Sequence, residues 1–193
     1  MTLTFSTAEG PDIPLWLITK SNGPDWPEQL NEQARSWATQ SGFGAGDGEI
    51  CVIPASDGTI AAALVGMGSA ESAKRQRFVF GAARAKLPAG TYAMANAPAD
   101  PDALSEAGLA WLLAGYRFTR YAGSATDMAE LRAPENCDAE RLEQIAAGEA
   151  LTRDLINTPA NDMGPAELEA AARTLAQTHK AEVTVTEGDA LLE

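Results

Sequence analysis

Hydrophobic and polar positions along this chain of 193 residues predict strands and helices in alternation. Apolar runs of strand length, bounded by polar or turn residues, occupy residues 15–19, 49–53, 59–65 and 91–95. The second and third runs are joined by a turn that contains Asp57-Gly58, which indicates a hairpin. Because helical patterns separate the other runs, we expect an α/β domain with a mixed sheet.

Two helices are predicted before residue 91. The first has Asp25 and Glu28 in capping-box spacing at its start and then follows helical periodicity. The second follows the turn Gly66-Met67-Gly68-Ser69. We expect it to turn four apolar side chains inward, namely Phe78, Val79, Ala82 and Ala83.

A third helix is capped by Asp100-Pro101 and is expected to run to about Tyr116. Its apolar residues lie on nearly every side, so we expect it to be buried or to lie between layers. Four aromatic residues gather around its end, namely Trp111, Tyr116, Phe118 and Tyr121. Packing in a core or a domain interface is the favoured use of such rings.

After a polar, proline-containing boundary at residues 133–137, the pattern predicts a long helix over about 138–156. A further helix follows, with one apolar stripe made of Leu168, Ala171, Ala172 and Leu175. Val183 and Val185 indicate a short strand after it. Helix, loop, helix and strand form an incomplete second α/β unit, so we expect residues 138–193 to be the least stable part.

Charge narrows the range of partners. The net charge is −13, and counting the charged residues assigns −3 (12 acids, 9 bases) to residues 1–126 and −10 (15 acids, 5 bases) to residues 127–193. Such a surface repels polyanions, so nucleic acid is not an expected partner. No apolar run approaches the roughly 20 residues that span a bilayer, and no secretory signal is expected. Cys51 and Cys137 are too few for a disulfide framework and are typical of idle thiols in a reducing cytoplasm.

Gly66-Met67-Gly68-Ser69 is the one candidate phosphate site, because backbone amides between a strand and a helix can hold an anion. The pattern lacks the third glycine of the dinucleotide fingerprint and an acidic residue about 20 positions later. We therefore interpret it as a structural turn.

Other candidates for chemistry have ordinary explanations. His179, the only histidine, falls near a helix end, and no Cys/His zinc pattern can be assembled. Asp127-Met128-Ala129-Glu130 is interpreted as a solvated loop or a helix start. Turn chemistry explains a group of polar residues near position 160, namely Asp154, Asn157, Asn161 and Asp162. We assign no catalytic, cofactor-binding or metal-binding residue to this chain.

The stretch from Thr152 to Leu168 combines a helix end, a rigid connector containing Asn157-Thr158-Pro159-Ala160-Asn161, and a new helix starting at Pro165. The sequence of this stretch resembles the interdomain junction of the leucyl aminopeptidase (cytosol aminopeptidase) family. Gly115-Tyr116-Arg117-Phe118-Thr119-Arg120-Tyr121 is similar to the Tyr-x-Phe-x-x-Tyr segment that precedes the junction in that family.

The resemblance implies a macro-domain-like N-terminal domain, a helical linker and the start of a peptidase domain, over residues 1–133, 134–157 and 158–193. It implies a parent enzyme that removes N-terminal residues from peptides with two divalent cations, zinc or manganese, in a cytoplasmic hexamer. The family's metal motifs do not occur in this sequence. The chain is then a non-catalytic part that serves assembly or substrate access. The alternative is a stand-alone macro-like module for a phosphorylated ligand such as ADP-ribose.

Overall fold

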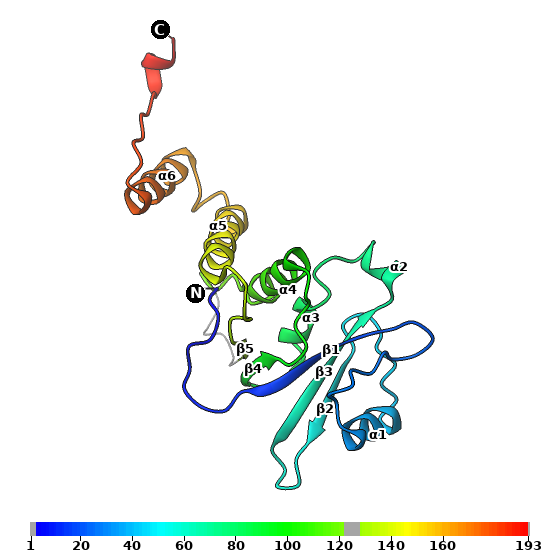
Figure 1. Cartoon of the computed structure of the whole chain (residues 1–193). Helices are drawn as coiled ribbons and strands as arrows, with labels where there is room; N and C mark the ends of the chain where they lie inside the picture. Colours follow the sequence, from blue (N-terminus) through cyan, green and yellow to red (C-terminus); the bar gives the residue numbers. More distant parts are fainter. Residues whose placement is uncertain (1–2, 122–127, 193) are drawn as a thin grey trace. The chain divides into compact units, whose positions relative to one another are not determined.

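The computed structural model of the chain describes residues 3–121 and 128–192 (Figure 1). It divides into two compact units, Met1–Ala150 and Leu151–Glu193. The elements are, in order, β1 (Ile13–Thr19), α1 (Glu32–Gln40), β2 (Ile50–Pro54), β3 (Ile60–Gly68), α2 (Ala70–Ala73), α3 (Gly81–Arg84), β4 (Gly90–Met94), α4 (Pro101–Ala114), β5 (Ala129–Leu131), α5 (Ala139–Asn157), α6 (Pro165–His179) and the 3₁₀ helix η1 (Gly188–Leu192).

The first unit contains a five-stranded sheet of order β2-β3-β1-β4-β5. β1 pairs in parallel with β3 and β4, β4 pairs in parallel with β5, and β2 is antiparallel to β3. The mixed α/β fold and the hairpin expected from the sequence are therefore confirmed. In the hairpin turn, the Asp57 carboxylate accepts hydrogen bonds from the amide and hydroxyl of Thr59, at 3.0 and 2.7 Å.

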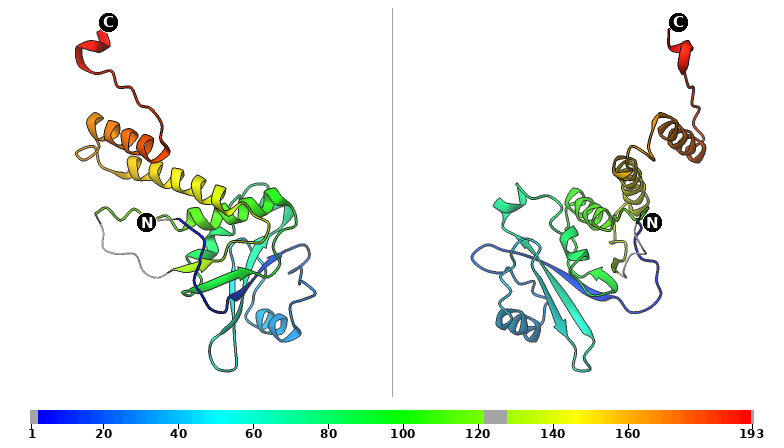
Figure 2. Two further views of the ribbon diagram at one scale, coloured as in Figure 1. Left: turned by 60° about the vertical axis from the view of Figure 1, so that its left-hand side comes forward. Right: turned by 180° about the vertical axis from the view of Figure 1, so that it is seen from behind.

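Helices cover both faces of this sheet (Figure 2). On one face, α1 buries Ala34 and Ala38 against Ile18 and Leu64 of the strands. On the other face, α3, α4 and the first turns of α5 enclose the larger core, whose biggest fully buried side chain is Trp111. The Trp111 ring lies 5.3 Å from that of Phe80. α4 is buried as its all-round apolar pattern predicts, and Trp111 packs in the core, whereas Tyr121 is 56% exposed.

Both expected helices before residue 91 differ from the structure in detail. The cap of α1 is Asn31, whose side chain accepts from the amide of Ala34 at 2.8 Å. Asp25 instead accepts hydrogen bonds from the hydroxyls of Thr19 and Ser21 in the loop after β1. The capping-box prediction was wrong because a polar residue nearer the apolar stripe makes the cap.

The second expected helix is broken into α2 and α3, each of four residues. Phe78 lies between them with φ +62°, which interrupts the helix, and its side chain is 43% exposed. Ala82 is also exposed and Val79 is only partly buried, so the predicted inward face is wrong except at Ala83. Phe80, which the pattern did not select, is 1% exposed and fills that place in the core.

Two predictions that concern strands were also wrong. Ala129 and Glu130 belong to β5, where Ala129 and Leu131 are buried, so these two residues form neither a loop nor a helix start. Asp127 lies outside the described residues. A three-residue strand at a sheet edge carries too little periodicity to be recognised. Around Val183 the chain forms no strand, because the described residues of the second unit contain no neighbouring strand to pair with it.

The second unit consists of the end of α5, α6 and η1. α6 starts with Pro165 at its first position, and Glu167 accepts from the amide of Gly164 at 2.9 Å. Both long helices agree with the sequence prediction. The predicted limits between the N-terminal domain and the linker, at 133/134, and between the linker and the peptidase domain, at 157/158, stay a prediction. Among the described residues, no helix is both long and apolar enough to cross a membrane.

Candidate functional sites

The first candidate is a cavity of about 650 Å³ at the carboxyl ends of the parallel strands. β1 lies between β3 and β4, so the chain crosses to one side of β1 and then returns to the other. Such a switch point is the place where open α/β sheets bind ligands. Leu17 and Met67 provide apolar lining, and polar groups come from the loops after each strand.

Asn96 holds the two strands together at this cavity. Its Oδ1 accepts from the amide of Leu17 and its Nδ2 donates to the Leu17 carbonyl, both at 2.8 Å. The side chain thus extends the ladder between β1 and β4 as another backbone residue would. Because these hydrogen bonds occupy its amide, Asn96 positions the wall of the cavity.

The turn Gly66-Met67-Gly68-Ser69 borders this cavity, but its amides have partners within the fold. The amide of Gly66 donates to the Glu49 carbonyl at 2.8 Å, and that of Gly68 donates to Ala45 at 3.1 Å. The Ser69 amide donates to Oγ of Ser72 at 2.9 Å. These hydrogen bonds favour a structural turn over a phosphate cradle.

Local charge and helix length also oppose an anion at this turn. Gly68 has φ +68°, and a Cβ there would meet Oδ1 of Asp47 at 1.6 Å. The Asp47 carboxylate therefore lies beside the turn, where it accepts from the Ser72 hydroxyl at 2.7 Å. α2, which follows, has only four residues and so provides little dipole. Among the described residues that line the cavity, Lys20 is the one basic residue.

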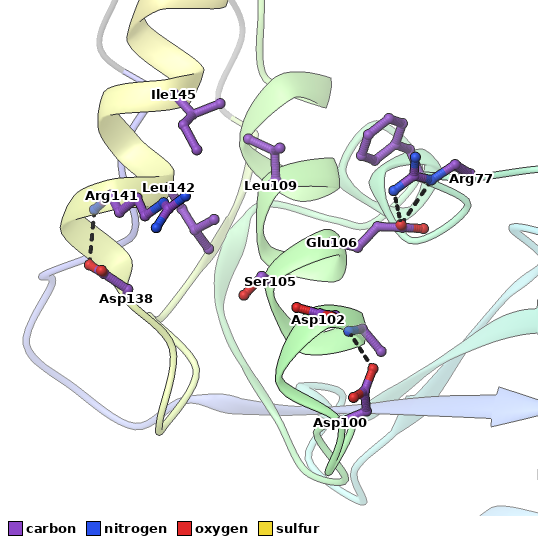
Figure 3. A pocket seen from close by; sticks show the side chains of 12 residues that line it. Arg77, Asp100, Asp102, Ser105, Glu106, Leu109, Asp138, Arg141, Leu142 and Ile145 are labelled. Atoms are coloured by element: carbon purple, nitrogen blue, oxygen red, sulfur yellow. Dashed lines mark hydrogen bonds and ion pairs between the residues drawn. The ribbon is translucent and has the colours of Figure 1, made fainter.

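A second cavity, of about 760 Å³, lies between α4 and the first turns of α5 (Figure 3). Four carboxylates and two arginines line it, but most have structural partners. Asp100 caps α4, Asp138 accepts from the amide of Arg141 at 3.1 Å, and Arg77 Nε donates to Glu106 at 2.9 Å. Phe78 and Ile145 add apolar walls, each 43% exposed.

A smaller hollow of about 210 Å³ adjoins both cavities. It shares Leu17 and Met67 with the switch-point cavity, and Phe78 and Glu106 with the cavity beside α5. Residues of α4 line this hollow and the cavity beside α5, and we call these two together the α4 groove. Sequence reasoning missed it because its walls come from loops that only the fold brings together.

The remaining candidates from the sequence belong to the second unit. His179 is the last residue of α6, at a helix end as predicted. Asp154 and Asn157 belong to the last turns of α5, and the Asp162 amide donates to the Pro159 carbonyl at 2.8 Å within the connector. These observations fit helix-end and turn roles.

Neither thiols nor carboxylates form a metal centre in the described part of the chain. Burial raises the pKa of the Cys51 thiol, and the same cause, with Asp138 nearby, raises the pKa of Cys137. No group of three or more His, Cys, Asp and Glu side chains among the described residues can hold a metal ion. The donor set of a two-metal site is therefore not assembled by residues 3–121 and 128–192.

Comparisons with known proteins identify the family. The family described as M17 aminopeptidase, N-terminal domain, matches residues 13–134. Among curated sequences, none matches this chain.

Solved structures show the same relationship. The structure of cytosol aminopeptidase from Coxiella burnetii matches 98% of this chain with 30% identity and a TM-score of 0.84. Two structures of the bottromycin maturation enzyme BotP, one of them in complex with Mn, match 93% and 94% of the chain at 26% and 24% identity, with TM-scores of 0.66 and 0.65. The chain spans about 40% of the length of these proteins. It belongs to the M17 aminopeptidase family and carries its N-terminal domain.

Proposed function

We propose that this chain is the N-terminal, non-catalytic portion of a longer leucyl aminopeptidase that removes N-terminal residues from peptides. The observation that carries the proposal is the difference between the share of this chain and the share of the cytosol aminopeptidase chain that the structural match covers. Nearly the whole chain, 98%, matches cytosol aminopeptidase, yet the match covers only 40% of that protein. The chemistry of such an enzyme then belongs to the part of the protein that this chain does not contain.

The proposed parent uses two divalent cations, zinc or manganese, to activate water and polarise the scissile carbonyl. Such a site needs several convergent ligands held by a supporting shell of hydrogen bonds. The described residues provide no such group, so we place the cations outside this chain and assign none of its residues to them. The proposed setting is a cytoplasmic homo-hexamer.

Within that enzyme, the domain serves assembly or substrate access. Support comes from the apolar side chains that the α4 groove leaves open, Phe78 and Ile145. Exposed apolar groups rimmed by charged ones are typical of protein contact surfaces. The ion pair between Arg77 and Glu106 holds the loop beside Phe78 in place.

The experiment compares the longer protein with and without residues 1–133. We expect the longer protein to hydrolyse leucine-anilide in a reaction that depends on added manganese or zinc. The 193-residue chain is measured in parallel. No metal-dependent turnover by the longer protein would refute the proposed enzyme.

A point substitution then separates the two roles. Ile145→Ser in the longer protein is compared with Ala147→Ser, a change at an exposed position of the same helix. For an assembly role, Ile145→Ser shifts sedimentation toward smaller species. For an access role, sedimentation is unchanged and the ratio of kcat/KM for a dipeptide to that for a longer peptide changes. If Ile145→Ser matches Ala147→Ser in both measurements, the groove has neither role.

A further inference from the structure

Arg84, the last residue of α3, is a buried cation that the fold satisfies only in part. Its side chain is 6% exposed, and Nη1 donates to the carbonyls of Trp111 and Leu112 at 3.1 and 3.4 Å. The guanidinium also lies 5.9 Å from the centre of the Trp111 ring. Nε is buried and has no hydrogen-bond partner among the described residues.

The contacts of Nη1 explain why an arginine is held here. The carbonyls at the end of α4 carry partial negative charge, and a cation beside them stabilises the helix. They do not account for the rest of the guanidinium, which has five N–H donors in a planar fork. A buried donor without a partner is destabilising. Nη2 makes no hydrogen bond to the described residues and is not closed off as Nε is, so its donors point to a further acceptor.

Arg84 lines a cavity of about 380 Å³ that is separate from the α4 groove. The other walls are the chain at residues 4–8 and the side chain of Glu130 in β5. Residues 4–8 lie beside the sheet edge, where Ser6 pairs with Arg132. Hydroxyl-bearing residues Thr4, Ser6 and Thr7 make this lining mainly polar.

The two charged residues of the cavity do not pair with each other. The Glu130 carboxylate accepts from the Ser6 hydroxyl at 2.6 Å, and Nη1 of Arg84 donates to the end of α4, while no hydrogen bond or ion pair joins these two described residues. Arg84 is buried whereas Glu130 is exposed, which places the cation at the inner end and the carboxylate at the mouth. Burial lowers the pKa of Arg84, and the charge of Glu130 opposes that shift; an arginine nevertheless stays protonated.

We propose that this cavity binds the head group of a free α-amino acid, with its carboxylate at Arg84 and its ammonium at Glu130. A zwitterion satisfies the unused guanidinium donors and the carboxylate at once, whereas a simple anion leaves Glu130 without a charged partner. A divalent cation is repelled by Arg84, and a nucleotide brings several negative charges toward Glu130. The volume lies within the range of small-molecule sites.

The proposal rests on the charges and hydrogen bonds of this cavity and not on the proposed function. A free amino acid is also the class of product that an aminopeptidase releases. The test below measures binding to the 193-residue chain without turnover, so its outcome is independent of whether a longer protein cleaves peptides.

The test is calorimetric titration of the 193-residue chain with three probes. L-alanine carries both charges, propionate only the carboxylate, and ethylamine only the ammonium. We expect saturable binding of L-alanine, weaker binding of propionate and none of ethylamine. The ¹⁵N resonance of Arg84 Nε–H shifts on addition of L-alanine. No saturation by L-alanine below about 10 mM, or equal affinity for L-alanine and propionate, overturns the proposal.

Two variants locate the binding. Glu130→Gln, at the exposed mouth, lowers the affinity for L-alanine about tenfold or more, because a charge-assisted hydrogen bond is lost. It does not weaken the binding of propionate, because it removes a negative charge from the cavity. The matched control is Glu135→Gln, at an exposed acid outside the cavity, which keeps wild-type affinity. Arg84→Met abolishes binding of both carboxylates, but it also removes a contact of α4. Glu130→Gln is therefore the variant that tests the site. If it binds L-alanine with wild-type affinity, the proposed site is refuted.

Discussion

The guanidinium of Arg132 binds the carboxylate of Asp12 through two hydrogen bonds, from Nε and Nη2, of 2.7 Å each. Arg132 directly follows β5, and Asp12 directly precedes β1. A third hydrogen bond joins Arg132 to the Ala8 carbonyl at 2.8 Å. One side chain thus fixes the start of the chain against the edge of the sheet, in the planar two-point geometry that arginine offers a carboxylate.

This pair predicts how stability depends on pH. The hydrogen bond from Arg132 lowers the pKa of Asp12, whereas in the unfolded chain that pKa is about 3.9. A depressed folded pKa stabilises the protein above the unfolded pKa, and this contribution is lost as pH falls through the folded value. We expect Asp12→Asn to destabilise at pH 7 and to have a diminishing effect as the pH falls below about 3.9, measured by urea unfolding. Because both side chains are partly exposed, the difference is small.

Glu135→Gln, at an exposed acid outside the pair, is the control and should show the same small effect at both pH values. If the destabilisation by Asp12→Asn were as large at pH 2 as at pH 7, the ion pair would not be its cause.

Two glycines with positive φ separate backbone strain from crowding. Gly68→Ala places a Cβ 1.6 Å from the Asp47 carboxylate at φ +68°, whereas Gly58→Ala meets nothing within 4 Å at φ +86°. We expect Gly58→Ala to cost about 1 kcal/mol from strain alone and Gly68→Ala to cost a further 1–3 kcal/mol, approximately, from overpacking. Chemical denaturation measures both. Equal losses would mean that the turn relaxes without disturbing the hydrogen bond between Asp47 and Ser72.

The 193-residue chain should have no aminopeptidase activity, with or without added manganese or zinc. The reason is that a two-metal site needs several convergent carboxylates, and no group of three or more His, Cys, Asp and Glu side chains among the described residues can hold a metal ion. A leucine-anilide assay on purified protein checks this. Metal-dependent turnover that persists after contaminating peptidases are removed would show that the chain itself is catalytic.

The Gly66–Ser69 turn should not bind ADP-ribose or NAD. Its amides at Gly66, Gly68 and Ser69 already have acceptors, and the Asp47 carboxylate repels a phosphate there. Calorimetry should detect no saturable binding. A dissociation constant below about 100 µM, roughly −5.5 kcal/mol, would revive the alternative of a stand-alone binding module, and loss of that affinity in Gly68→Ala would locate it.

The second unit should be the least stable part of the chain. Its side chains Ile156, Leu168 and Leu175 are 75%, 54% and 45% exposed, and the segment around Val183 has no strand partner. Residues 138–150 are excluded from this prediction because Leu142 and Ala146 lie in the core of the first unit. Amide exchange should be faster in residues 151–193 than in the β2–β3 hairpin, and limited proteolysis should cut near Asn161. A tail as protected as that hairpin would contradict the prediction.

The sequence by itself determined those elements whose signal is local and long enough to be read. The β2–β3 hairpin follows from two apolar runs around Asp57-Gly58, and α4 follows from the Asp100-Pro101 cap and a continuous apolar surface. The connector between α5 and α6 follows from proline and asparagine chemistry. The sequence of residues 152–168 indicated the family, and the match of residues 13–134 to the M17 aminopeptidase N-terminal domain confirmed it.

Only the tertiary structure decided which loops and side chains meet. The positive φ of Phe78 broke a predicted helix because Phe80 packs on Trp111 instead, and β5 exists because β4 offers it an edge. The α4 groove and the Arg84 cavity gather residues that are far apart in the chain. Periodicity records only which face of a segment is apolar, whereas pairing, burial and the position of a charge depend on contacts between distant segments.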